Sequence, residues 1–232
     1  IAKSIIKLRP AEGRLEKIGK LKNNGKVILD YAHTPDALET ILKNIQEQFP
    51  SAKLRLVFGC GGDRDKAKRS KMGKIASRFA DTIYLTDDNP RSENPAKIRK
   101  DIKKGISNTN IKEISNRKIA ISDCINNLNS GEIAIIAGKG HEKTQDYNGK
   151  KNFLSDRKEI LRSINAKNKK LFNDFRINLI QDKTKLLSNN LKSNKVSINS
   201  KELKKNDIFF AIKGKFNDGN KFLKEAIHKK CS

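Results

Sequence analysis

The sequence predicts an α/β fold: a Rossmann-like, mostly parallel sheet with helices on both faces, followed by a linker and an incomplete second α/β unit. Short apolar runs alternate along the chain with longer segments whose apolar residues recur at helical spacing. The short runs are continuously apolar, which is typical of strands buried on both faces of a parallel sheet. Ligands of such sheets bind beyond the carboxyl ends of the strands, so function is expected in the loops that follow strands.

Five strands are expected, at residues 27–30, 54–58, 82–86, 111–114 and 133–137. The first helix begins where Thr34 can cap it and Pro35 can take its first position, and its apolar residues share one face through Phe49. Asn94 and Pro95 give a second start of the same kind, over residues 95–104, with a stop at Gly105. Further helices are expected around 72–79, from 122 to 131 and over 157–164.

The domain organisation follows from where this alternation ends. Residues 1–166 form the first domain, and residues 167–190 are Asn- and Lys-rich and are expected to be a linker with some helix. Residues 191–232 start a second unit, with a strand at 207–212 and a helix at 221–229, and stop before a core could close. Because the only methionine is Met72, we expect the chain to be a segment cut from a longer polypeptide.

Composition narrows the classes of partner. The formal net charge of +25 suggests nucleic acid, an anionic membrane surface or acidic substrates. Lysines outnumber arginines 39 to 12 and are spread along the chain, and only 6% of residues are aromatic, so specific nucleic-acid reading is disfavoured. No apolar run approaches bilayer length, and Cys60, Cys124 and Cys231 fit neither a disulfide framework nor a zinc site. A cytoplasmic protein without membrane insertion is expected.

The turn Asp87–Arg91, which follows the strand at 82–86, is a candidate reader of a small anion. Pro90 fixes its own φ and favours an extended backbone at Asn89. The Asn89 amide and the Arg91 guanidinium are therefore expected to project from a rigid turn. The helix that starts at Pro95 also favours an anion at its N-terminus. Taken alone, the five residues fit an ordinary solvated loop more often than a site.

Three other loops are expected at the same edge of the sheet. Gly59, Gly61 and Gly62 can form an N–H-rich nest beside Arg64, although glycine-rich turns are common after strands. The sequence GKGHE at 138–142 offers a His and a Glu for a cation, with a solvated loop as the alternative. His33, before a helix, fits a structural hydrogen bond better than catalysis. There is no metal-ligand spacing and no GxxxxGK[ST] loop.

Read together, five motifs resemble the C-terminal domain of the Mur ligases, and in particular of the branch that adds 2,6-diaminopimelate. They cover roughly residues 9–165: DYAHTPD (30–36), GCGGDRDKAKRSKMG (59–73), DDNPR (87–91), AGKGHE (137–142) and SDR (155–157). The resemblance implies an ATP-dependent amide ligase of peptidoglycan synthesis. ATP phosphorylates the γ-carboxylate of UDP-N-acetylmuramoyl-L-Ala-D-Glu, and the amine of the incoming amino acid then attacks the acyl phosphate.

The resemblance also implies residue roles. Arg64, Asn89 and Arg91 would hold the carboxylates of meso-diaminopimelate, on a turn shaped by Asp88 and Pro90. Gly138 and Glu142 would engage the distal amino-acid centre, with Glu142 meeting its ammonium group. Three residues match ATP-facing positions: Arg14, Asp30 and His33. ATP and Mg²⁺ would be held mainly by a central domain outside this sequence, so no catalytic residue is expected here. In the family DNPR accompanies diaminopimelate, and another residue in place of its Arg accompanies lysine.

The tail has a second resemblance. Residues 198–214 and 216–219 are similar to the start of the N-terminal, UDP-sugar-binding domain of a Mur ligase, of the branch that adds D-alanyl-D-alanine. Ser200 would face the uracil, but Lys201 stands where the family usually has Arg. Two alternatives stay open for the chain: a basic nucleic-acid-binding module, and a related amide ligase such as folylpolyglutamate synthase, which DNPR and GKGHE disfavour.

Overall fold

The computed structural model describes residues 11–107, 110–184, 196–197, 199–209 and 219–229. They fall into two compact units, Ile1–Asp174 and Phe175–Ser232. The first unit holds a six-stranded sheet in the order β1-β2-β6-β3-β4-β5. Its strands are β1 (Glu16–Lys17), β2 (Lys26–Asp30), β3 (Leu54–Phe58), β4 (Thr82–Leu85), β5 (Ile111–Glu113) and β6 (Ile133–Ala137). Only β1 is antiparallel to its neighbour, so the predicted mostly parallel sheet is confirmed.

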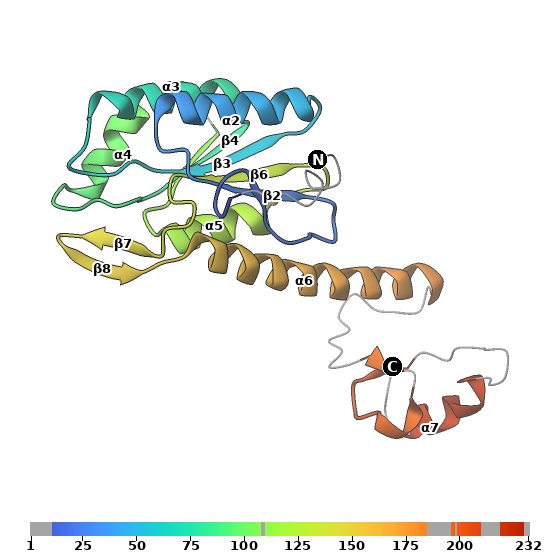
Figure 1. Ribbon diagram of the computed structural model, residues 1–232. Coiled ribbons are helices and arrows are strands. Elements are labelled where there is room, and N and C mark those ends of the chain that lie inside the picture. The colour runs from blue at the N-terminus through green and yellow to red at the C-terminus, as the bar shows by residue number, and fades with distance from the viewer. Residues whose placement is uncertain (1–10, 108–109, 185–195, 198, 210–218, 230–232) are drawn as a thin grey trace, which may run out of the picture. The chain divides into compact units, whose positions relative to one another are not determined.

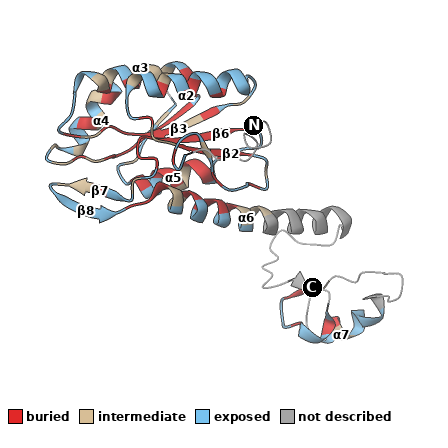
Figure 2. Ribbon diagram, viewed as in Figure 1, coloured by how far each residue is buried: buried red, intermediate tan, exposed pale blue. Residues whose placement is uncertain are grey.

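Helices cover both faces of the sheet, as predicted. Figure 1 shows α2 (Pro35–Gln48), α3 (Ala67–Phe79) and α4 (Pro95–Lys103) on one face, with α5 (Arg117–Asn126) and α6 (Asp156–Thr184) on the other. Successive strand residues contribute to the two cores alternately: Leu56 and Phe58 pack on the side of α2 and α3, whereas Val57 packs with α5. Figure 2 shows the central strands as buried, and because both of their faces are buried their sequences are continuously apolar.

The predicted starts of α2 and α4, each preceded by a capping residue, are confirmed. The Thr34 side chain accepts from the Ala37 amide at 3.3 Å, and the Asn94 side chain accepts from Ala96 at 2.9 Å and Lys97 at 3.3 Å. Both helices have proline at their first position. Side-chain capping and the preset φ of proline thus fix these starts locally.

Three expectations of secondary structure were wrong or incomplete. The helix predicted at 122–131 is α5, which begins at Arg117 because the Asn116 side chain caps it and ends at Asn126. Helix α6 continues to Thr184, through most of the segment expected to be a linker. A hairpin of β7 (Thr144–Tyr147) and β8 (Lys150–Phe153) was not predicted. The domain boundaries themselves remain predictions.

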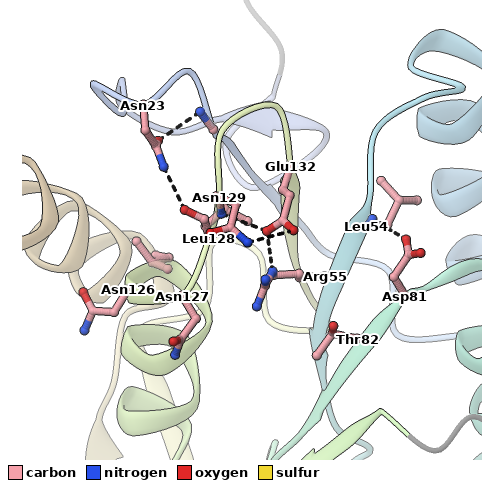
Figure 3. Close-up of polar contacts among 12 residues, drawn as sticks. Asn23, Leu54, Arg55, Asp81, Thr82, Asn126, Asn127, Leu128, Asn129 and Glu132 are labelled. Carbon is pink, nitrogen blue, oxygen red and sulfur yellow. Dashed lines mark hydrogen bonds and ion pairs between the residues drawn. The ribbon is translucent and has the colours of Figure 1, made fainter. Parts of the chain in front are cut away.

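At the amino-terminal edge of the sheet, the polar groups bond to one another (Figure 3). The Arg55 Nε donates to Glu132 at 2.7 Å, and Asp81 accepts from the Leu54 amide at 2.7 Å. Glu132 also accepts from the Asn129 amide at 2.8 Å. A cavity of about 320 Å³ at this edge is lined by these same side chains, whose carboxylates already have donors. The polar groups at this edge of the sheet therefore hold neighbouring segments of the chain together, and their carboxylates are not free to bind a ligand.

The second unit is described by itself. It comprises β9 (Val196–Ser197), η1 (Ser200–Glu202), β10 (Ile208–Phe209), η2 (Gly219–Phe222) and α7 (Leu223–His228), and β9 pairs in parallel with β10. Residues 210–212 of the predicted strand at 207–212, and residues 198, 210–214 and 216–218 of the tail motif, lie outside the described residues. Within the described part of the chain, no helix is both long and apolar enough to cross a membrane.

Candidate functional site

A cavity of about 480 Å³ lies at the carboxyl edge of the sheet, where the loops after β2, β3, β4 and β6 meet. The structure brings seven of the predicted site residues to its wall: His33, Arg64, Asp88, Asn89, Arg91, Gly138 and Glu142. Pro90 is buried next to them, and Arg14 and Asp30 are absent from the lining. The lining also includes residues without a predicted role, among them Tyr31, Lys68 and Lys71.

The glycine-rich loop after β3 packs directly against the turn that carries Arg91. A Cβ built on Gly62 would lie 1.9 Å from the Pro90 carbonyl oxygen, so no side chain fits there. The Gly62 amide donates to the Asn89 carbonyl at 2.9 Å, and the Gly62 carbonyl accepts from the Arg91 guanidinium at 2.6 Å. These glycines therefore hold the turn at close range, which leaves Gly62 N–H unavailable to a ligand.

Asn89 presents its amide in one orientation. Its Oδ1 accepts from the Lys139 Nζ at 3.1 Å and from the Asp146 amide at 3.1 Å, while its Nδ2 donates to Glu142 at 3.0 Å. Two donors on the oxygen assign the NH₂ group to the cavity side. Asn89 can thus donate to a ligand acceptor such as a carboxylate.

Glu142 and Asp88 supply negative charge to the same cavity. Burial acts to raise the pKa of Glu142, but the hydrogen bond and charge of Lys139 at 2.8 Å, with the Asn89 contact, lower it below its ordinary value. Burial raises the pKa of Asp88, and the nearby cations Arg117 and Lys139 oppose that rise. The cavity therefore joins guanidinium groups and a carboxylate that stays ionised, which complements a zwitterion.

The residues predicted to face ATP gather around Tyr31. The Arg14 guanidinium lies 5.5 Å from the Tyr31 ring centroid, and the His33 ring lies 4.6 Å from it. The His33 Nδ1 lies 2.9 Å from the Tyr31 carbonyl oxygen, which can only accept, so Nδ1 is the donor of this contact. Asp30 differs, because its two oxygens accept at 2.7 Å from the Leu15 and Ala32 amides and so fix the backbone.

Ser200 lies in the second unit. It is buried, and its hydroxyl donates to Glu225 at 2.8 Å. The Lys229 Nζ donates to the Ser200 carbonyl at 2.9 Å. These contacts hold the local turn, and the uracil-side role of Ser200 stays a prediction.

Three residues with prominent contacts were not predicted as site residues. Lys139 is completely buried against Asn89 and Glu142, although a lysine in a glycine-rich loop is usually solvated. Gln145 and Tyr147 belong to the β7–β8 hairpin and bond to the turn at 87–91. The signal that could have found the hairpin is Asn148-Gly149, a strong two-residue hairpin turn, here with φ of 50° and 77°.

Metal ligands do not cluster in the described part of the chain, where no group of three or more His, Cys, Asp or Glu side chains is placed to hold an ion. The Arg14 guanidinium and the His33 ring both lie against the Tyr31 ring. A guanidinium beside aromatic rings fits contact with a nucleotide.

Two known proteins of similar sequence are ligases of the same name. A 2,6-diaminopimelate-adding UDP-N-acetylmuramoyl-L-alanyl-D-glutamate ligase of Rickettsia rickettsii is 48% identical over 164 residues, which are 69% of this chain and 33% of the relative. The ligase of the same name from Buchnera aphidicola subsp. Baizongia pistaciae is 45% identical over 162 residues, 69% of this chain and 32% of the relative. The chain thus spans about a third of the length of these relatives.

A solved structure of a ligase with that name superposes with a TM-score of 0.63 at 41% identity, over 71% of this chain and 34% of the solved one. The family profile described as "Mur ligase, glutamate ligase domain" matches residues 13–140, more than half of the 232 residues. Those residues contain β1 to β6 and every residue of the cavity lining except Glu142. The chain belongs to the Mur ligase family.

Proposed function

We propose that residues 1–166 are the amino-acid-binding domain of an ATP-dependent ligase that adds meso-diaminopimelate to UDP-N-acetylmuramoyl-L-Ala-D-Glu. One observation carries the proposal: a single cavity combines Arg64, Arg91 and a donor-oriented Asn89 amide with the ionised Glu142. Diaminopimelate has two carboxylates and two ammonium groups, so it needs both kinds of partner. The relatives that cover this region carry the name of that ligase.

The roles of the side chains follow from their chemistry. Arg91 and Asn89 donate to the distal carboxylate, and Arg64 at the exposed rim adds a second guanidinium. Glu142 and the Gly138 backbone receive the ammonium at the same end, and because a Cβ on Gly138 would lie 2.8 Å from Asp88 Oδ2, the absence of a side chain leaves room beside that carboxylate. The other amine of the ligand is then free to attack the activated γ-carboxylate.

Discrimination against lysine follows from the same contacts. Lysine lacks the distal carboxylate, so the half-buried donors of Asn89 and Arg91 would lose an acceptor. A charge-assisted hydrogen bond is worth roughly 1.5–3 kcal/mol, and a donor left unpaired costs about as much again. The site should therefore reject lysine by a factor on the order of 10² or more.

ATP supplies the phosphoryl group that activates the acceptor carboxylate when it is bound. On this chain we assign Arg14 and His33, which both contact Tyr31, to the ATP side, and Asp30, which accepts from the Leu15 and Ala32 amides, to holding the backbone there. Mg²⁺ and the phosphate-binding loop are assigned to a central domain outside these 232 residues. The second unit, 191–232, is proposed to begin a UDP-sugar-binding domain with Ser200 near the uracil, and the parent enzyme to be cytoplasmic.

The nucleic-acid alternative has a distinct signature. Non-specific binding through lysines weakens steeply with salt, so DNA binding that survives physiological salt would favour it. Folylpolyglutamate synthase remains the other alternative, and it would use glutamate in place of diaminopimelate.

The proposal is tested in a full-length ligase in which residues 1–166 of this chain are joined to the N-terminal and central domains of one of the relatives named above. The enzyme should add meso-diaminopimelate in an ATP-dependent manner, and Arg91→Ala should lower kcat/KM for it by about 10²-fold because the distal carboxylate loses its guanidinium. Lys118→Ala, an exposed site on α5, is the matched control. Equal addition by Arg91→Ala and the parent would refute the assignment.

A further inference from the structure

We propose that the β7–β8 hairpin is a positioning element for the diamino-acid site, in which Gln145 and Tyr147 set the direction that Asn89 and Arg91 face. The proposal rests on the function proposed above and adds residues to it. Neither side chain lines the cavity, so both would act through the turn at 87–91.

The turn needs outside support because Arg91 has a φ of +53°. A non-glycine residue rarely adopts this left-handed conformation without surrounding contacts that hold it. The hairpin provides them on both sides of Arg91: its amide donates to the Asp146 carbonyl at 3.0 Å, and its carbonyl accepts from the Asn148 amide at 2.8 Å. These contacts leave Arg91 as a bridge partner of Tyr147.

Gln145 holds the first half of the turn. Its side chain is buried, and its Nε2 donates to the carbonyls of Asp87 at 3.1 Å and Asp88 at 2.6 Å. One amide group thus fixes two successive peptide planes immediately before Asn89. The next hairpin residue, Asp146, donates its own amide to the Asn89 Oδ1 and so sets which face of that amide meets the ligand.

Tyr147 ties the same turn to the rest of the domain. Its hydroxyl donates to Asp87 Oδ2 at 3.0 Å, and the other oxygen of Asp87 pairs with Arg99 of α4. Arg99 also donates to Glu113 of β5 at 2.8 Å. Burial and the neighbouring Asp87 carboxylate raise the pKa of Tyr147, so its hydroxyl remains a donor throughout the neutral range.

The contacts are confined to one strand of the hairpin. All four residues of β8 are exposed, whereas Gln145, Asp146 and Tyr147 of β7 and Asn148 of the hairpin turn bond to residues 87–91. Lys151 on β8, opposite Asp146, is exposed and lies in the same hairpin. Substitution there perturbs the hairpin without touching the turn, which makes Lys151→Met a matched control.

The test compares Gln145→Met, Tyr147→Phe and Lys151→Met in the 232-residue chain. Each protein is titrated with meso-diaminopimelate and with L-lysine while the backbone amide resonance of Asn89 is followed, and the unfolding midpoint is recorded. Gln145→Met should weaken diaminopimelate binding about tenfold and Tyr147→Phe about threefold, because the turn loses its donors. Binding of lysine should change less than twofold in both, and Lys151→Met should match the parent.

The possible results distinguish the positioning role of the hairpin from the proposed diaminopimelate site itself. Folded variants that bind diaminopimelate as tightly as the parent would overturn the positioning role and leave the proposed function intact. The same conclusion would follow if a variant bound diaminopimelate and lysine more weakly by the same factor. A parent chain that gives no saturable response to diaminopimelate would overturn the proposed site itself. If Gln145→Met does not fold, Tyr147→Phe carries the test, because it removes one hydroxyl and keeps the ring.

Discussion

At the scale of single residues, the site depends on polar side chains whose partners are far away in sequence. Lys139 is the clearest case, because it donates to Asn89, 50 residues away, and so orients that amide, while its pair with the nearby Glu142 keeps that carboxylate ionised. The sequence placed Asn89, Arg91 and Glu142 at one edge of a sheet. It could not show that Lys139 is buried, since burial of a lysine depends on partners 50 residues away.

The carboxylate of Glu93, just after the turn, should make stability sensitive to acid. The hydrogen bonds from the buried Arg69 lower the pKa of Glu93 from 4.5 to about 2. A depressed pKa contributes stability above pH 4.5 that is lost as the pH falls toward about 2. Thermal unfolding measured from pH 7 to pH 2 should show this loss in the parent, and Glu93→Gln should reduce it.

Glu12→Gln, at an exposed position, is the control for that series and should leave the acid profile as it is. If Glu93→Gln and the parent lose stability in parallel between pH 4.5 and pH 2, the Arg69 contact does not contribute what its geometry indicates.

At the scale of elements, a completely buried ion pair joins two helices behind the site. Arg117 at the start of α5 donates to Asp156 at the start of α6 at 2.7 and 2.9 Å, and also to the Ala137 carbonyl at the end of β6 at 2.9 Å. Three elements thus meet at one guanidinium. Removing a single member of such a pair leaves an uncompensated charge in the interior.

Asp156→Asn should therefore lower the free energy of unfolding by about 3 kcal/mol, as measured by urea denaturation. Asp36→Asn, an exposed carboxylate at the start of α2, is the matched control and should cost less than about 1 kcal/mol. A comparable small cost for both substitutions would contradict the structural importance of the pair.

The elements also show what sequence reasoning captures. The strands β2, β3, β4 and β6 were predictable because burial on both faces leaves an unbroken apolar run. Helix α5 was placed five residues late because its first turn contains the buried but charged Arg117, which breaks the apolar pattern. The β7–β8 hairpin was not predicted, because its strands are largely polar and are not part of the main sheet.

At the scale of the whole molecule, the sheet explains why motifs spread over more than a hundred residues form one site. Parallel strands β2, β6, β3 and β4 are neighbours in that order, so their carboxyl ends deliver four loops to one cavity. The net charge of +25 has no comparable localisation in the sequence. The net charge therefore does not locate a binding site, whereas the order of the parallel strands does.

The central claim is that Arg91 reads the second carboxylate of a diamino acid. It is tested most directly by following the side-chain Nε–H resonance of Arg91 in the chain during titration with meso-diaminopimelate and, separately, with L-lysine. The account predicts a saturable shift of this resonance with meso-diaminopimelate and none with L-lysine, since only the former carries the distal carboxylate. An equal shift with both ligands, or no shift while diaminopimelate binds, would contradict it.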